Sequence, residues 1–164
     1  MEALLHWCEW LQATTLATSL RESGYAYPLI EGSHVLSLSL SVGTVMWFDL
    51  RLMGVAFQRA SVSKLFTQVR PWMLTGFAVM FLSGGLLFSA RASEAFHSVY
   101  FRTKMALLLA AGLKLLLFHL TVDRRRHEWD TQMPPPTAAR VAGGLSLFLW
   151  FAIIAAGRVM AYNL

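Results

Sequence analysis

The sequence predicts an all-α integral membrane protein, a bundle of four transmembrane helices preceded by an amphipathic interfacial helix. The chain of 164 residues is 56% hydrophobic, whereas a soluble domain is usually about 45–50% apolar. A helix needs about 20 apolar residues to cross a hydrocarbon core of about 30 Å. Four stretches supply that length, and they leave room only for short loops, so we expect one membrane domain over 1–164. The four expected spans are 28–50, 72–90, 100–122 and 141–162.

The N-terminal segment, 1–22, mixes apolar and polar residues at helical spacing. It begins with Glu2, whereas a signal peptide begins with a basic region. Trp7 and Trp10 suit the headgroup zone of a bilayer. We therefore expect a short amphipathic helix that lies on the membrane surface. Pro28 suits the start of the first spanning helix.

The net charge of +5 is concentrated in two loops. Basic residues are enriched in cytoplasmic loops of membrane proteins, so we expect the loops after the first and third spans to be cytoplasmic. Both termini would then face the periplasm of a bacterium, with the chain in the inner membrane. No basic patch stands apart from the spans, so a nucleic-acid partner is not expected. The basic residues of the two loops are Arg51, Arg59, Lys64, Arg70, Arg124, Arg125, Arg126 and Arg140.

Small residues recur in three of the four spans, where close helix contact in lipid depends on small side chains. They predict that all four helices pack into one bundle. The main ones are Ser37, Ser41 and Gly43 in the first span, Gly76, Ser83 and Gly84 in the second, and Gly143, Gly144 and Gly157 in the fourth.

Ionisable residues lie mainly in the first and third spans. Ionisable groups inside a membrane are costly and commonly functional. His34 lies one turn from Glu31 and faces the small-residue seam, so it is the strongest candidate for a functional residue. On the third helix His97, Lys104 and His119 share one stripe. The stripe therefore carries a histidine above the membrane, a lysine near the outer leaflet and a histidine near the inner boundary.

The remaining charged residues of the spans have simpler interpretations. Lys114 points away from the stripe and is expected to extend to the cytoplasmic headgroups. Asp49 and Arg51 are interpreted as boundary residues at the cytoplasmic end of the first helix. Arg51 is also well placed to bind an anionic group.

A b-type haem is the cofactor that this pattern favours. Haem iron takes imidazole ligands, the macrocycle fits between bundle helices, and its propionates pair with Arg or Lys. His34 would be the first axial ligand. His119 lies about 20 Å away along the bundle axis at 1.5 Å per residue, so one haem cannot easily bridge the two. The second ligand stays open between His97, a nearby methionine and none.

Two runs of sequence are similar to a known group of small bacterial membrane proteins. The run HVLSLSLSVGTVMWFDLRL from His34, and FRTKMALLLAAG from Phe101 with Lys104, resemble the first and third helices of HemJ/CopD-like proteins. The resemblance implies four helices, haem b, and functional positions at His34 and Lys104. HemJ-like members take part in protoporphyrinogen oxidation, and CopD-like members are linked to copper handling.

Three functions follow from these observations. The first is a haem-b redox protein that passes electrons between quinone and a partner protein or substrate. Such a protein would act as a membrane oxidoreductase or as a cytochrome b subunit. The second is a component for metal or small-solute transport that uses His34, Glu31 and methionines such as Met46, Met80 and Met160. The third is a non-catalytic membrane subunit of an oligomer or complex, in which the polar groups only hold helices together.

Overall fold

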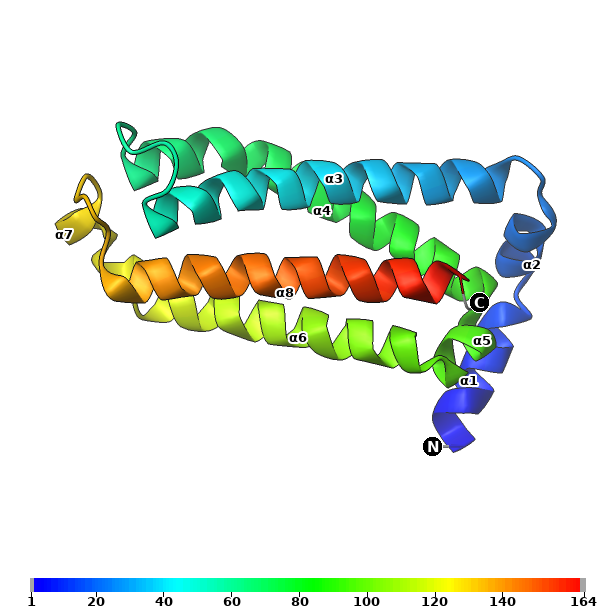
Figure 1. The fold of residues 1–164 in the computed structure, drawn as a ribbon. Coiled ribbons are helices and arrows are strands. Elements are labelled where there is room, and N and C mark those ends of the chain that lie inside the picture. Colours follow the sequence, from blue (N-terminus) through cyan, green and yellow to red (C-terminus); the bar gives the residue numbers. More distant parts are fainter. Residues whose placement is uncertain (1, 163–164) are drawn as a thin grey trace.

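Four long helices form the body of the protein, and five short helical segments lie at its ends (Figure 1). The computed structural model describes residues 2–162, and within that range it contains no strand. Each long helix is long and apolar enough to cross a membrane, which confirms the predicted fold class. The long helices are α3 (Ala26–Met53), α4 (Val62–Ala90), α6 (Val99–Leu120) and α8 (Thr137–Tyr162). The short segments are α1 (Glu2–Gln12), α2 (Thr15–Glu22), α5 (Ala92–His97), the 3₁₀ turn η1 (Asp123–Arg125) and α7 (Arg126–Trp129).

Helix α3 occupies the centre, because it packs against both α4 and α8. Glycines allow the close approach on both sides. A Cβ on Gly76 of α4 would collide with the Ser41 hydroxyl and come within 3.0 Å of the Ser37 carbonyl oxygen. A Cβ on Gly143 of α8 would lie 2.8 Å from the Asp49 carbonyl oxygen. The expectation that small residues mark the packed faces is therefore confirmed at these two contacts.

Helix α6 lies at the edge of the bundle and packs mainly along α8 (Figure 1). Phe118 is the one buried residue of α6 among those that the structure describes. The rest of the helix presents leucines outward, including Leu109 and Leu113. The four helices are thus packed in the spatial order α4, α3, α8, α6, and α6 contributes less to the interior than the other three.

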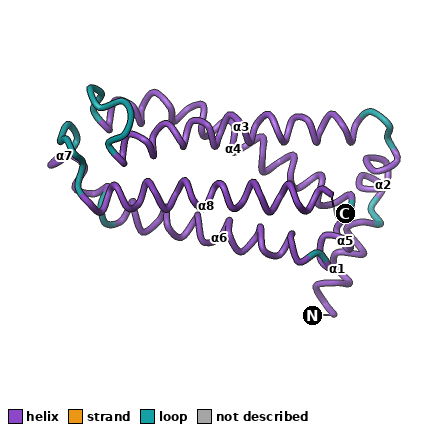
Figure 2. Tube along the Cα trace, in the orientation of Figure 1, coloured by secondary structure: helices purple, strands orange, loops and turns teal. Residues whose placement is uncertain are grey.

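The two ends of the bundle differ. We call the end with α1, α2 and α5 the capped end, and the end with the α3–α4 loop, η1 and α7 the loop end (Figure 2). The expected surface helix over 1–22 is divided into α1 and α2, and the Thr14 hydroxyl caps α2 by accepting from the Ala17 amide at 3.4 Å. At the capped end the Trp7 ring stacks on Phe88 at 6.5 Å between ring centroids.

At the loop end the helix bounds differ from those expected. Helix α3 continues to Met53 and ends at Gly54, whose φ of 75° is left-handed backbone that glycine adopts without strain. Helix α4 begins at Val62, ten residues before the expected start, because the Ser61 hydroxyl caps it by accepting from the Lys64 amide at 3.2 Å. The apolar core of this end is formed by Leu52, Val62, Phe118, Trp129 and Ala139.

Candidate functional site

The half-buried imidazole of His34 is held against α4. Its Nδ1 lies 3.0 Å from the Ser83 hydroxyl oxygen, and that hydroxyl donates its only proton to the Val79 carbonyl oxygen at 2.6 Å. The same hydroxyl lies 3.2 Å from the Met80 carbonyl oxygen, and the Met80 backbone is also within hydrogen-bonding reach of the His34 ring. A Ser83 hydroxyl that donates to a carbonyl oxygen accepts from Nδ1, and in that tautomer the lone pair of the neutral ring resides on Nε2.

A glycine of α4 and a lysine of α6 lie near this ring, and a second glycine lies beside the lysine. A Cβ on Gly84 would lie 3.1 Å from Cε1 of His34, so the glycine allows the imidazole to approach α4. The half-buried Lys104 of α6 lies close enough to interact electrostatically with His34. Its Nζ would be 3.6 Å from a Cβ on Gly157 of α8. The structure thus brings together His34 and Lys104, with Ser83, Gly84 and Gly157; we call these five residues the His34 cluster.

The other predicted site residues lie elsewhere. His97 ends α5, is exposed, and contacts the ring of Phe96 edge-on. His119 lies near the loop end with a side chain that is 73% exposed, and its Nδ1 is 2.9 Å from Oδ2 of Asp123. Arg51 is 17 residues from His34 along α3, about 25 Å at 1.5 Å per residue. These three residues do not join the His34 cluster, so the expected stripe on the third helix does not form one site.

A second polar cluster lies near the loop end, between α3, α8 and α6. Asp49 is only 2% exposed. The Ser146 hydroxyl of α8 is within hydrogen-bonding reach of its carboxyl group, and Lys114 of α6 is near enough to interact electrostatically with it. Oδ2 of Asp49 is buried without a hydrogen-bond partner. We call Asp49, Ser146 and Lys114 the Asp49 cluster.

Two charged residues of the spans lie within the bundle. Asp49, interpreted as a boundary residue, is buried, and α3 continues beyond it to Met53. Lys114, expected to extend to the headgroups, is half-buried, and its Nζ lies 5.7 Å from the centroid of the Phe118 ring. The sequence does not single out Ser146, because it is one of several small residues in the fourth span. The feature of the sequence that points to this cluster is the presence of an aspartate and a lysine, Asp49 and Lys114, within two of the expected spans.

Arg51 faces the other side of α3, toward the α4 and α7 segments. Its guanidinium is fully buried and donates from Nε to the Ala60 carbonyl oxygen at 2.7 Å and from Nη2 to the Asp130 carbonyl oxygen at 3.3 Å. Arg51 therefore joins three segments of the loop end. It is buried rather than exposed at the end of α3, and the carboxyl group of Asp130 is near enough to interact with it electrostatically.

The carboxyl group of Asp130 stabilises the same junction. It accepts from the Ser63 amide at 2.6 Å. Burial alone would raise the pKa of Asp130, but hydrogen bonds from Ser63 and Ser61 and the nearby Arg126 together lower it. The ionised form is therefore favoured in the folded protein.

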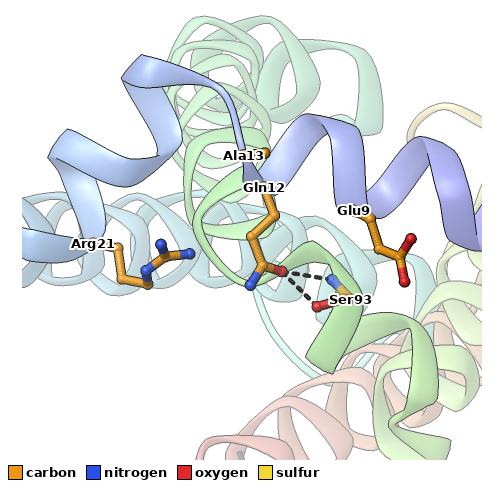
Figure 3. Close-up of a pocket in the computed structure, with 5 residues that line it drawn as sticks. All are labelled: Glu9, Gln12, Ala13, Arg21 and Ser93. Atoms are coloured by element: carbon orange, nitrogen blue, oxygen red, sulfur yellow. Dashed lines mark hydrogen bonds between the residues drawn. The ribbon is translucent and has the colours of Figure 1, made fainter.

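A shallow polar pocket lies at the capped end (Figure 3). It is lined by Glu9, Gln12, Ala13, Arg21 and Ser93. Gln12 Oε1 accepts from both the amide and the hydroxyl of Ser93, at 2.9 and 2.7 Å, which fastens α1 to α5. None of the His34 cluster lines this pocket, so its polar groups serve the attachment of the cap.

Within residues 2–162, no three His, Cys, Asp or Glu side chains come together as a ready metal-ion site. The polar chemistry of the bundle thus resides in two separate places: the half-buried imidazole of His34 near the capped end, and the buried carboxyl group of Asp49 with an unpartnered oxygen near the loop end. His34 and Asp49 are 15 residues apart on α3, about 22 Å.

Comparison with known proteins identifies a family for this chain. No curated protein and no solved structure matches the chain. One family model, described as a family of unknown function (DUF6644), matches residues 7–163. This range includes all four long helices and both polar clusters, and the chain therefore belongs to the DUF6644 family.

Proposed function

We propose that this protein binds haem b through His34 and passes electrons between a quinone and a partner protein or substrate. The observation that carries the proposal is the orientation of the His34 ring. A histidine that ligates a metal usually donates its other ring N–H to a fixed acceptor, which sets the tautomer and the direction of the lone pair. The Ser83 hydroxyl is placed to be such an acceptor for Nδ1, and in that arrangement Nε2 would be the atom that ligates the iron.

The surroundings of His34 fit the rest of the cofactor. Haem supplies one-electron chemistry when it is bound. The Lys104 ammonium is near the ring and would pair with a propionate. Gly84 and Gly157 leave the adjacent helix surfaces without side chains. His97 and His119 do not approach His34, so the proposal names His34 as the ligand and assigns neither of these histidines as the second one.

The proposed setting is the inner membrane of a bacterium, with the loop end in the cytoplasm and both termini in the periplasm. The support is the excess of basic residues at that end, in the α3–α4 loop, in η1 and α7, and in the adjoining turns of the long helices. Fusion of a reporter that matures only in the periplasm to the C-terminus tests this arrangement. Activity of that fusion is expected, and activity only of a fusion within the α3–α4 loop would reverse the orientation.

An absorption spectrum of the detergent-purified protein from haem-replete cells tests the cofactor. We expect a Soret band in the wild type that is lost in His34→Ala and kept in His97→Ala and His119→Ala. We also expect Ser83→Ala to keep the fold but to weaken haem binding about 10–100-fold, as is typical of a lost partner of a ligating histidine. Colourless wild-type protein, or a Soret band unchanged by His34→Ala, would contradict the proposal.

A further inference from the structure

We propose that Asp49 is a proton-exchange site in the loop-end half of the membrane domain, with Ser146 and Lys114 as its partners. The inference does not depend on a cofactor at His34. It rests on the burial of the carboxyl group, on its unpartnered oxygen, and on the particular groups that face it.

The burial of Asp49 is nearly complete and its hydrogen bonding is incomplete. The residue is 2% exposed, and Oδ2 has no hydrogen-bond partner. A buried charge without full hydrogen bonding is costly, because the low-dielectric interior does not replace the water that it loses. Protonation of Oδ2 removes that charge and requires no rearrangement of the helices. An aspartate held in this way therefore alternates readily between two protonation states.

The groups around Asp49 select a proton over a metal ion. On α6 the charged neighbour is Lys114, and on α8 the neighbour is the uncharged Ser146 hydroxyl. Arg51, two residues along α3, points to the opposite side and binds the carbonyl oxygens of Ala60 and Asp130.

A divalent cation would need about six oxygen ligands, whereas this cluster offers one carboxylate and one hydroxyl beside an existing ammonium group. A proton needs only the free oxygen. Uptake forms an O–H bond on Oδ2 with a proton taken from solvent, and release breaks the same bond and returns the proton to solvent. No electron is transferred, so the step requires neither an oxidant nor a reductant.

Infrared difference spectroscopy of the full chain in detergent or nanodiscs tests this site. The protein is labelled with ¹³C-carboxyl aspartate, and spectra are recorded across a pH series in which it stays folded. The label restricts the signal to Asp49, Asp123 and Asp130, which are all the aspartates of the sequence. At pH values above the ordinary aspartate pKa, where Asp130 stays ionised, we expect a protonated-carboxyl band that gains intensity as the pH falls, that disappears in Asp49→Asn, and that persists in Asp123→Asn.

Two further variants keep the test decisive if Asp49→Asn does not fold. Ser146→Ala is expected to shift the frequency of the band, because a hydroxyl near the carboxyl group is removed. Lys114→Met is expected to increase the intensity of the band at neutral pH, because a neighbouring positive charge favours the carboxylate. Lys64→Met, at an exposed position on α4, is the matched control and should leave the band unchanged.

Three results would overturn the proposal. The first is the absence of any aspartate band over the pH range in which the wild type is folded, since Asp49 would then be a permanently ionised structural group. The second is a band that remains in folded Asp49→Asn above the ordinary aspartate pKa, where Asp130 stays ionised. The third is a band that responds to neither Ser146→Ala nor Lys114→Met.

Discussion

The contact between α3 and α4 makes a quantitative prediction for two glycines of the same helix. A Cβ on Gly76 would meet the Ser41 hydroxyl and lie within 3.0 Å of both the Ser37 carbonyl oxygen and the Ser41 amide nitrogen. A Cβ on Gly85 would meet nothing within 4 Å. Gly76→Ala and Gly85→Ala therefore add the same methyl group to the same helix, once against backbone and once in open space.

The expected difference follows from two opposing terms. Replacing a helical glycine with alanine stabilises a helix by about 1 kcal/mol at either position. Overpacking a close contact costs roughly 1–3 kcal/mol, and this cost arises only at Gly76, because α3 backbone atoms cannot move aside without shifting the helix. Gly85→Ala should therefore raise stability by up to about 1 kcal/mol. Gly76→Ala should be less stable than Gly85→Ala by about 1–3 kcal/mol.

Unfolding of the purified variants, titrated with a denaturing detergent and followed by circular dichroism, measures this difference. The double variant Ser41→Ala/Gly76→Ala should recover part of the loss, because the nearest atom is removed while the backbone contacts remain. Equal stability of the two single variants would refute the reasoning, since it would mean that α3 and α4 are not in close contact at Gly76.

Three other predictions concern the ends of the helices. Arg51→Met should lower the free energy of unfolding by several kcal/mol, because each carbonyl oxygen left unpaired in the interior costs about 1–3 kcal/mol. The same detergent titration measures this loss. A variant as stable as the wild type would show that the junction does not need the guanidinium. The lowered pKa of Asp130 means that its stabilising effect is fully present above the ordinary aspartate pKa and is lost as the pH falls through the folded-state value. Asp130→Asn should therefore flatten the acid limb of a melting-temperature profile against pH, and an unchanged limb would assign the acid sensitivity to other groups. Ser98 caps α6 by accepting from the Phe101 amide at 3.3 Å, so Ser98→Ala should cost about 1 kcal/mol in a thermal melt, whereas a Ser98→Asp variant should melt close to wild type.

The amino-acid sequence predicts only some of the residues that form the two polar clusters. His34 and Lys104 were selected because an ionisable group in an apolar span is unusual, and the structure places them near each other. Ser83 could not be selected, because a serine in a span is far more often a packing residue. His119 was selected for the same reason as His34, yet it lies near the loop end beside Asp123. The haem and quinone assignments stay predictions until the spectra are recorded.

The residue pattern is sufficient to predict the class of the protein, an all-α membrane domain with four spans and small-residue packing faces. Hydrophobicity, helix length and residue size are local properties, so one chain displays them directly. The folded chain was needed to show which helices meet, that α6 lies at the edge, and that Asp49 and Arg51 are buried. Burial is not a local property, because it depends on where a helix ends and on what packs against it. The Ser61 cap, the left-handed Gly54 and the Arg51 hydrogen bonds to Ala60 and Asp130 are contacts between segments, and no periodicity within a single span records them.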